Sequence, residues 1–64
     1  MFTMEIKTGN AAFCDPSTGE ENHTYKAEEI ARILKETEYK IRLGQTQGSI
    51  MDYNGNRVGK WSLE

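Results

Sequence analysis

Apolar and polar residues alternate at the start of the chain, in segment 2–8. Phe2, Met4 and Ile6 would share one face of a β-strand there, because successive side chains point to opposite faces of a sheet. Turn-forming residues follow this segment. For the next segment, 11–13, the pattern leaves two alternatives open, a short second strand and a packed loop.

A helical period replaces the alternation between Tyr25 and Leu43. Apolar residues recur there three or four positions apart, as they do on one face of an α-helix. The predicted apolar stripe consists of Ala27, Ile30, Ala31, Leu34 and Ile41, with Ile33 beside it. Thr24 is suited to cap the N-terminus, because its hydroxyl can accept a hydrogen bond from a first-turn N–H. Gly44 stands where a left-handed residue would end the helix.

The last part of the chain, 48–63, predicts two strands joined at Asn54-Gly55. Asn-Gly is a strong hairpin signal because both central residues of a type I′ turn need a positive φ. A two-residue turn would place Ile50 beside Trp61 on a face covered by the helix, which favours this register. A three-residue turn with a bulge at Gly55 is the alternative, and it would shift the strand pairing.

Together these elements predict an α+β protein in which one helix packs on one face of a small antiparallel sheet. The order is β-α-β-β, or ββαββ if 11–13 forms a strand. A chain of 64 residues is enough for a single small domain, 1–64. A polar loop, 14–24, leads into the helix, and its turn residues and charges predict a flexible segment.

The predicted sheet has an outer face that the helix does not cover. In the two-residue register Met51, Tyr53 and Val58 lie on this face, with Arg57 and Lys60 close by. Apolar side chains on an uncovered face often mark contact with a partner protein or with a second copy of the chain. The alternative is an ordinary surface with scattered apolar residues. These five residues form the predicted partner-binding site.

Composition narrows the classes of function. Eight basic and ten acidic residues give a net charge of −2, whereas a nucleic-acid-binding domain normally carries a basic excess. A nucleic-acid-binding accessory protein that uses Arg57, Lys60 and nearby aromatic residues is therefore the less favoured alternative. The single cysteine excludes an internal disulfide. No long apolar run or leader-like segment is present, so we expect a cytoplasmic protein without membrane association.

One motif resembles the beginning of a calcium-binding loop. Asp52-x-Asn54-x-Asn56 has the right first positions, but Arg57 and Leu63 stand where such a loop needs glycine and glutamate. Asp and Asn are also typical turn residues, because their side chains bond to nearby backbone groups. We therefore interpret the motif as turn chemistry.

Cys14 and His23 are the remaining candidates for chemistry. They supply two of the four ligands that a structural zinc site requires. Cys14 as a nucleophile would need an oriented base and an oxyanion hole, and no segment of the chain has the pattern of either. We expect no catalytic residues, no metal, no cofactor and no enzyme activity.

Three segments of the chain share a pattern with known proteins. They are Thr8-Gly9-Asn10-Ala11-Ala12-Phe13, Glu29-Ile30-Ala31-Arg32-Ile33-Leu34 and Asp52-x-Asn54-Gly55-Asn56-x-Val58-Gly59-x-Trp61. The pattern resembles a group of very short bacterial and phage proteins with no assigned activity. Many of these have T-D-N-A-A-F where this chain has Gly9, and a shorter segment before the helix.

The resemblance implies a prophage or mobile-element setting and supplies no catalytic residues. Small proteins in such settings often act by binding another molecule. We therefore expect a non-enzymatic protein-interaction module, for example an inhibitor of a host-defence protein. Its predicted partner is another protein or a second copy of the chain, which would form a homodimer.

Overall fold

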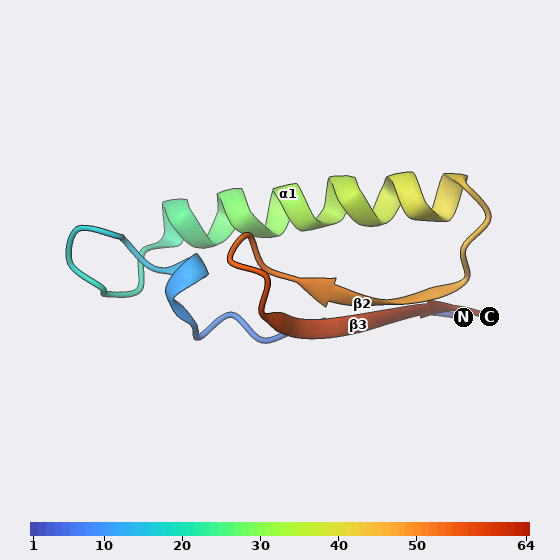
Figure 1. Ribbon diagram of the computed structural model, residues 1–64, viewed down its shortest axis with the longest axis horizontal. Helices are drawn as coiled ribbons and strands as arrows, with labels where there is room; N and C mark the ends of the chain where they lie inside the picture. The colour runs from blue at the N-terminus through green and yellow to red at the C-terminus, as the bar shows by residue number, and fades with distance from the viewer.

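The computed structural model describes all residues from Met1 to Glu64. Its elements are β1 (Phe2–Ile6), the 3-10 turn η1 (Ala11–Phe13), α1 (His23–Arg42), β2 (Gln47–Met51) and β3 (Arg57–Leu63). The strands form one antiparallel sheet in the order β1-β3-β2, and α1 packs on one face of it (Figure 1). The predicted α+β fold with the order β-α-β-β is confirmed, and ββαββ is wrong because 11–13 is not a strand.

Strand β3 is the central strand of the sheet, and its pairing with β1 and β2 determines which residues face α1. Phe2, Met4 and Ile6 lie opposite every second residue of β3, so they share one face as predicted. Across the other pairing, Gly48 of β2 lies opposite Trp61. A Cβ at Gly48 would be 2.9 Å from Trp61 Nε1, so this glycine leaves the space that the indole fills. The buried indole N–H has no acceptor within the chain.

The core forms between α1, the sheet and η1. Its buried members are Ala12, Phe13, Ile33, Ile50, Val58 and Trp61. η1 places Phe13 in this core, and Phe13 is 0% exposed. Asn10 caps this turn by accepting a hydrogen bond from the amide of Ala12 at 3.1 Å. Of the two alternatives for 11–13, the packed turn is therefore the one observed.

Helix α1 begins two residues earlier than predicted, because Asn22 caps it instead of Thr24. The Asn22 side-chain oxygen accepts a hydrogen bond from the amide of Thr24 at 2.9 Å. At the other end Gly44 has a φ of 97°, in the left-handed region. The amides of Gly44 and Gln45 donate to carbonyls of the last helical turn, which is the Schellman motif. The predicted end of the helix is confirmed.

The buried side of α1 differs from the predicted stripe. It is centred on Ile33, with Glu29 and Thr37 also buried. The Thr37 hydroxyl donates to the Ile33 carbonyl at 2.9 Å, so it is satisfied inside the core. Members of the predicted stripe that are exposed instead are Ala27, Ala31 and Leu34. Because successive helical residues are about 100° apart, Leu34 lies on the flank of the helix and not over the sheet.

The hairpin between β2 and β3 uses the three-residue turn. Gly55 has a φ of 85°, whereas Asn54 has no positive φ, and this excludes a type I′ turn. The Gly55 amide donates to the Asp52 carbonyl at 3.0 Å, and the Asp52 amide donates to the Asn56 carbonyl at 2.9 Å. These bonds define a type I turn followed by a left-handed glycine. The predicted two-residue turn is wrong, whereas the prediction that Ile50 and Trp61 share the helix-covered face is confirmed.

A β-bulge follows from this turn. Ile50 lies opposite Gly59, and the next pair along is Met51 with Arg57. Val58 is the extra residue between them, and a bulge re-aims the side chain at that position. Val58 joins the core and is only 5% exposed. The prediction that Val58 lies on the outer face is therefore wrong.

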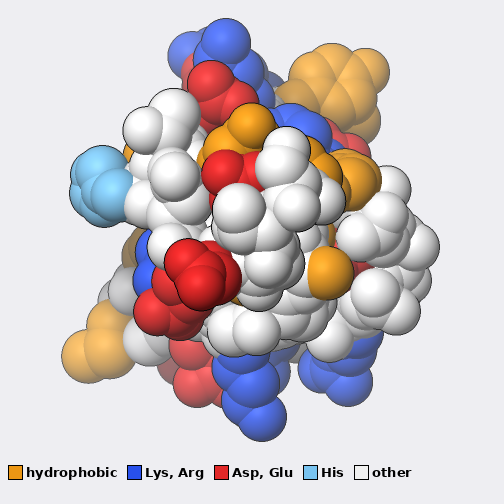
Figure 2. All heavy atoms as spheres, turned by 90° about the vertical axis from the view of Figure 1, so that its left-hand side faces the viewer, with side chains coloured by type: hydrophobic (Ala, Val, Ile, Leu, Met, Phe, Trp, Pro, Cys, Tyr) orange, Lys and Arg blue, Asp and Glu red, His pale blue; other side chains and the backbone are white.

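The polar loop 14–24 folds into tight turns. Cys14 and Glu21 form an isolated antiparallel bridge, and the Asp15 carboxylate accepts a hydrogen bond from the Ser17 amide at 2.7 Å. The flexibility of this loop stays a prediction. The end of the molecule that carries the loop shows mostly backbone and side chains that are not hydrophobic, with hydrophobic side chains in separate areas (Figure 2). The structure has no helix with the length and apolar character needed to cross a bilayer.

Candidate functional site

The outer face of the sheet carries polar side chains. The strand pairing places Thr3, Glu5, Gln47, Ser49, Lys60 and Ser62 there. The hydroxyls of Thr3 and Ser62 are 3.0 Å apart, and Lys60 Nζ lies 3.8 Å from a Glu5 oxygen. They line a shallow hollow of about 700 Å³. Because the strand pairing places polar residues along this face and Val58 is buried, the face lacks the continuous apolar surface that the sequence predicted.

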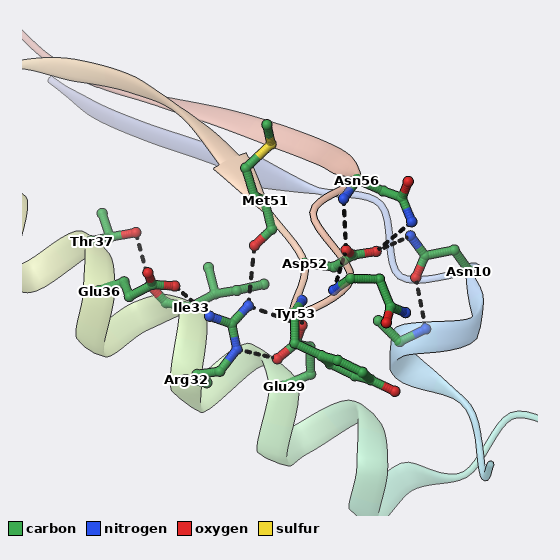
Figure 3. Close-up of polar contacts among 12 residues, drawn as sticks. Asn10, Glu29, Arg32, Ile33, Glu36, Thr37, Met51, Asp52, Tyr53 and Asn56 are labelled. Carbon is green, nitrogen blue, oxygen red and sulfur yellow. Dashed lines mark hydrogen bonds and ion pairs between the residues drawn. The ribbon is translucent and has the colours of Figure 1, made fainter.

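The five predicted partner-binding residues do not form one surface. Val58 is buried in the core. Met51 and Arg57 pair at one end of the outer face, where the Met51 side chain points away from α1 (Figure 3), and Lys60 lies further along β3. Tyr53 is exposed in the turn between the strands. Four of the five are therefore accessible, but they are spread over two regions.

The alternative nucleic-acid surface lacks a stacking platform of the predicted kind. Trp61 is buried against α1, so it is not available to stack on a base. Arg57 and Lys60 share the outer hollow with Glu5 and Glu64, which balance their charge. No observation therefore favours nucleic acid over protein as a partner.

A network of polar groups joins α1 to the hairpin and to the segment before η1 (Figure 3). We call it the polar clasp; its side chains belong to Asn10, Glu29, Arg32, Asp52 and Asn56. The Glu29 carboxylate is buried and accepts hydrogen bonds from the Tyr53 amide at 2.8 Å and from Arg32 Nη2 at 3.0 Å. A buried carboxylate needs such partners, because burying an unpaired charge is costly.

Arg32 ties the clasp to the end of β2. Its Nη2 donates to the Met51 carbonyl at 3.1 Å, and its Nη1 donates to Glu36. The hydrogen bond to Glu29 raises the pKa of Arg32; desolvation opposes the rise, and the charges of Glu29 and Glu36 add to it. The guanidinium therefore holds the helix against this edge of the sheet.

Asp52 organises the hairpin turn. Its Oδ1 accepts hydrogen bonds from the amides of Asn54 and Asn56, both at 2.9 Å, and its Oδ2 accepts from Asn10 Nδ2 at 2.7 Å. Burial opposes ionisation here, but hydrogen bonds from Asn56, Asn10 and Asn54 outweigh it and lower the pKa of Asp52. The interpretation of the calcium-like motif as turn chemistry is confirmed.

This lowered pKa predicts an acid-dependent loss of stability. Because the folded pKa of Asp52 lies below its usual value of 3.8, its stabilising effect is full above that value and is lost as the pH falls through the folded pKa. Thermal unfolding followed by circular dichroism from pH 7 to low pH should show this loss. Asp52→Asn should melt several degrees lower at pH 7 and show a smaller change on acidification. An equal acid response in both proteins would contradict the prediction.

Cys14 and His23 do not form a site. The Cys14 side chain is buried and its thiol donates to the Asn10 carbonyl at 3.3 Å, whereas His23 is exposed as the first residue of α1. No three His, Cys, Asp or Glu side chains gather closely enough to hold a metal ion.

The outer edge of β1 presents unpaired backbone groups. The Lys7 amide donates to the Val58 carbonyl of β3 at 2.7 Å, so the odd-numbered residues of this strand direct their backbone groups toward β3. Backbone groups alternate in direction along a strand. The N–H and C=O groups of Phe2, Met4 and Ile6 therefore point away from the sheet, where another strand could pair with them.

The outer edge of β2 is partly closed by the clasp. The Leu63 amide donates to the Thr46 carbonyl, so the odd-numbered residues of β2 direct their backbone groups outward. One of these outward carbonyls, that of Met51, is bonded to Arg32. A charged side chain on an edge discourages pairing with another strand. The two edges therefore differ, and β1 is the open one.

A groove of about 370 Å³ lies between β1 and α1. It is lined by Phe2, Met4, Leu34, Thr37, Glu38, Ile41 and Arg42. Phe2 is 46% exposed and Leu34 is 49% exposed. A helix about 10 Å across cannot cover three strands that span about 14 Å, and the clasp holds α1 toward β2. The helix-facing side of β1 is therefore only partly covered.

The fold defines a small α+β protein with one helix on an open three-stranded sheet. No protein-family model matches the chain, and neither the curated proteins nor the solved structures include one that is significantly similar to it. The resemblance to short bacterial and phage proteins stays a prediction.

The open β1 edge and its groove, which we call the β1 site, were missed in the sequence. One signal was present: segment 2–7 alternates without a proline, a glycine or an inward-pointing charge, which are the features that usually protect an edge strand. Leu34 gave no such signal, because its half-exposure is known only from the structure. The clasp as a whole gave no such signal, because the three segments that it joins, at Asn10, Glu29–Arg32 and Asp52–Asn56, are far apart in the sequence.

Proposed function

We propose that this protein is a non-enzymatic interaction module that binds a partner protein at the β1 site. The observation that carries the proposal is the meeting of an open strand edge with a partly covered apolar groove. Strand addition at such an edge supplies backbone hydrogen bonds, and adjacent pockets for alternate side chains supply specificity. Phe2 and Leu34 provide the apolar contacts of this kind.

The polar outer face of the sheet is not a contact surface in this proposal. Its side chains bond to one another, as between Thr3 and Ser62, and they keep that face hydrated. The partner therefore binds at the side of the sheet and not across its outer face. The proposal keeps the interaction module that the sequence predicted and moves its contact surface from Met51 and Tyr53 to the β1 site.

The biological setting that we propose rests on the resemblance to short phage and bacterial proteins. Two partners for the β1 site are then open: a host protein, for example a defence protein whose own exposed strand or strand-forming segment pairs with β1, and a second copy of the chain. In the first case inhibition would follow from occupying that segment, without any chemical step by this chain.

Site-specific photo-crosslinking in the cells that naturally produce the protein tests this function. Leu34 is replaced by p-benzoylphenylalanine, which reacts on illumination with whatever lies against it. We expect a crosslinked product from this position, because the half-exposed Leu34 side chain opens into the groove.

The matched control places the same residue at Tyr39, which is 64% exposed on the opposite flank of α1. Position 39 should give no product of the same mass. Absence of any product from position 34, or equal products from both positions, would contradict the proposed function.

A further inference from the structure

We infer that the occupant of the β1 site is a second copy of this chain, bound edge to edge through β1 in antiparallel orientation. The inference rests on the proposed function and names the partner for the same site. The resulting dimer would have a continuous six-stranded sheet, with both helices on one face. Three features of β1 support a copy of itself as the partner.

The first feature is the register of the open backbone groups. Outward groups occur at Phe2, Met4 and Ile6, so the set is symmetric about Met4. An antiparallel copy can place its own Met4 opposite Met4, with Phe2 opposite Ile6 at each end. Every outward group then has a partner, which gives roughly six backbone hydrogen bonds across the two-fold axis.

The second feature is charge. In the register centred on Met4, Glu5 lies opposite Thr3 of the second copy, and no like-charged side chains face each other. Shifting the pairing by two residues, so that Glu5 lies directly opposite Glu5, would bring two like charges together, which is unfavourable. Shifting it by a single residue would send the apolar residues to the other face. The charges and the alternation are therefore compatible with the register in which every outward backbone group is paired.

The third feature is the groove. The register places the second copy's strand along the uncovered side of β1, with its apolar side chains on the helix-facing side. Phe2 then lies beside Ile6 of the second copy, and its exposed surface is covered. The exposed Leu34 of the apolar stripe lies on this same flank of α1 and lines the groove. A second copy would cover this side chain, which the chain's own sheet leaves exposed.

The expected affinity is modest. The accessible surface of one chain is 4659 Å², and an interface that takes about a tenth of it buries roughly 1,000 Å² in both copies together. This is at the low end for a specific interface, so we expect a dissociation constant in the micromolar range. The protein should therefore be in equilibrium between monomer and dimer at ordinary laboratory concentrations.

Sedimentation equilibrium of the purified chain from about 5 to about 500 µM tests the inference. We expect the mean mass to rise from that of the 7.3 kDa monomer toward twice that value. Leu34→Lys should raise the dissociation constant at least about tenfold, because it puts a charge into the shared groove. Tyr39→Lys, on the opposite flank, should leave it unchanged.

A second change tests the backbone pairing itself. A chemically synthesised chain with a methyl group on the Met4 amide nitrogen loses an outward N–H while its side chain and its pairing with β3 are kept. Its circular dichroism spectrum should match that of the unmodified chain, and its dissociation constant should rise as for Leu34→Lys. A dimer that survives both changes would overturn the inference.

The crosslinking result separates this inference from the proposed function. A product from position 34 with the mass of two chains supports both. A product with another protein, together with a chain that stays monomeric up to about 500 µM, overturns the homodimer and leaves the interaction module supported. Absence of any product together with a monomeric chain overturns both.

Discussion

Replacing Gly59 with alanine should remove a large part of the stability of this protein. A Cβ at position 59 would lie 1.9 Å from the carbonyl oxygen of Glu5 and 2.9 Å from its carbonyl carbon. Both atoms belong to the backbone of β1, so no side-chain rotation can relieve the clash. β1 would have to move away from β3, and with it the pairing that holds Phe2, Met4 and Ile6 over the core.

The expected loss is about 3 kcal/mol, at the upper end of what overpacking usually costs, because a backbone pairing is strained as well. A domain of this size has a total stability of roughly 3–10 kcal/mol. Urea unfolding followed by Trp61 fluorescence measures the change. Gly9→Ala is the matched control, because a Cβ at position 9 has nothing within 4 Å and should change stability by less than about 0.5 kcal/mol. Similar stabilities for the two variants would show that β1 does not approach Gly59 this closely.

The fold class could be predicted because its signals are local. Alternation in 2–8 needs only the period of a strand, and Gly44 needs only the left-handed conformation that ends a helix. Neither depends on contacts between distant segments. Such signals gave the order of the elements and the helix-facing side of β1 correctly.

The rotation of α1 about its axis could not be predicted from its apolar pattern. The apolar residues are centred near Leu34, but the helix packs with Ile33 toward the sheet. The contacts that set this rotation are polar and long-range: Glu29 accepts from the Tyr53 amide, and Arg32 donates to the Met51 carbonyl. The apolar flank that this rotation leaves exposed is part of the β1 site, so the candidate site was missed for the same reason.

The hairpin shows how one local signal can support two structures. Asn54-Gly55 satisfies a type I′ turn, but a left-handed Gly55 also completes a type I turn with a bulge. The Asp52 carboxylate favours the second, because it accepts the amides of Asn54 and Asn56 together. Asn10, far away in the sequence, completes the bonding of that carboxylate. The sequence of the hairpin alone gives no sign of this contact with Asn10.

Val58→Asp is the sharpest test of the bulged register. In the two-residue register position 58 would lie on the outer face, and an aspartate there would be tolerated. In the observed register Val58 is buried with Phe13 and Ile33, where a charge would lose its hydration. We expect a loss of about 4 kcal/mol or more, enough to unfold much of the population.

Met51→Asp is the matched control, because Met51 lies exposed at the end of the outer face, opposite Arg57. Its stability should stay within about 0.5 kcal/mol of the unchanged protein. If Val58→Asp leaves no folded protein to measure, Val58→Thr keeps the shape of the side chain and buries only a hydroxyl, so its cost of about 1–3 kcal/mol remains measurable by urea unfolding. A Val58→Asp variant as stable as Met51→Asp would mean that Val58 faces solvent, as in the two-residue register.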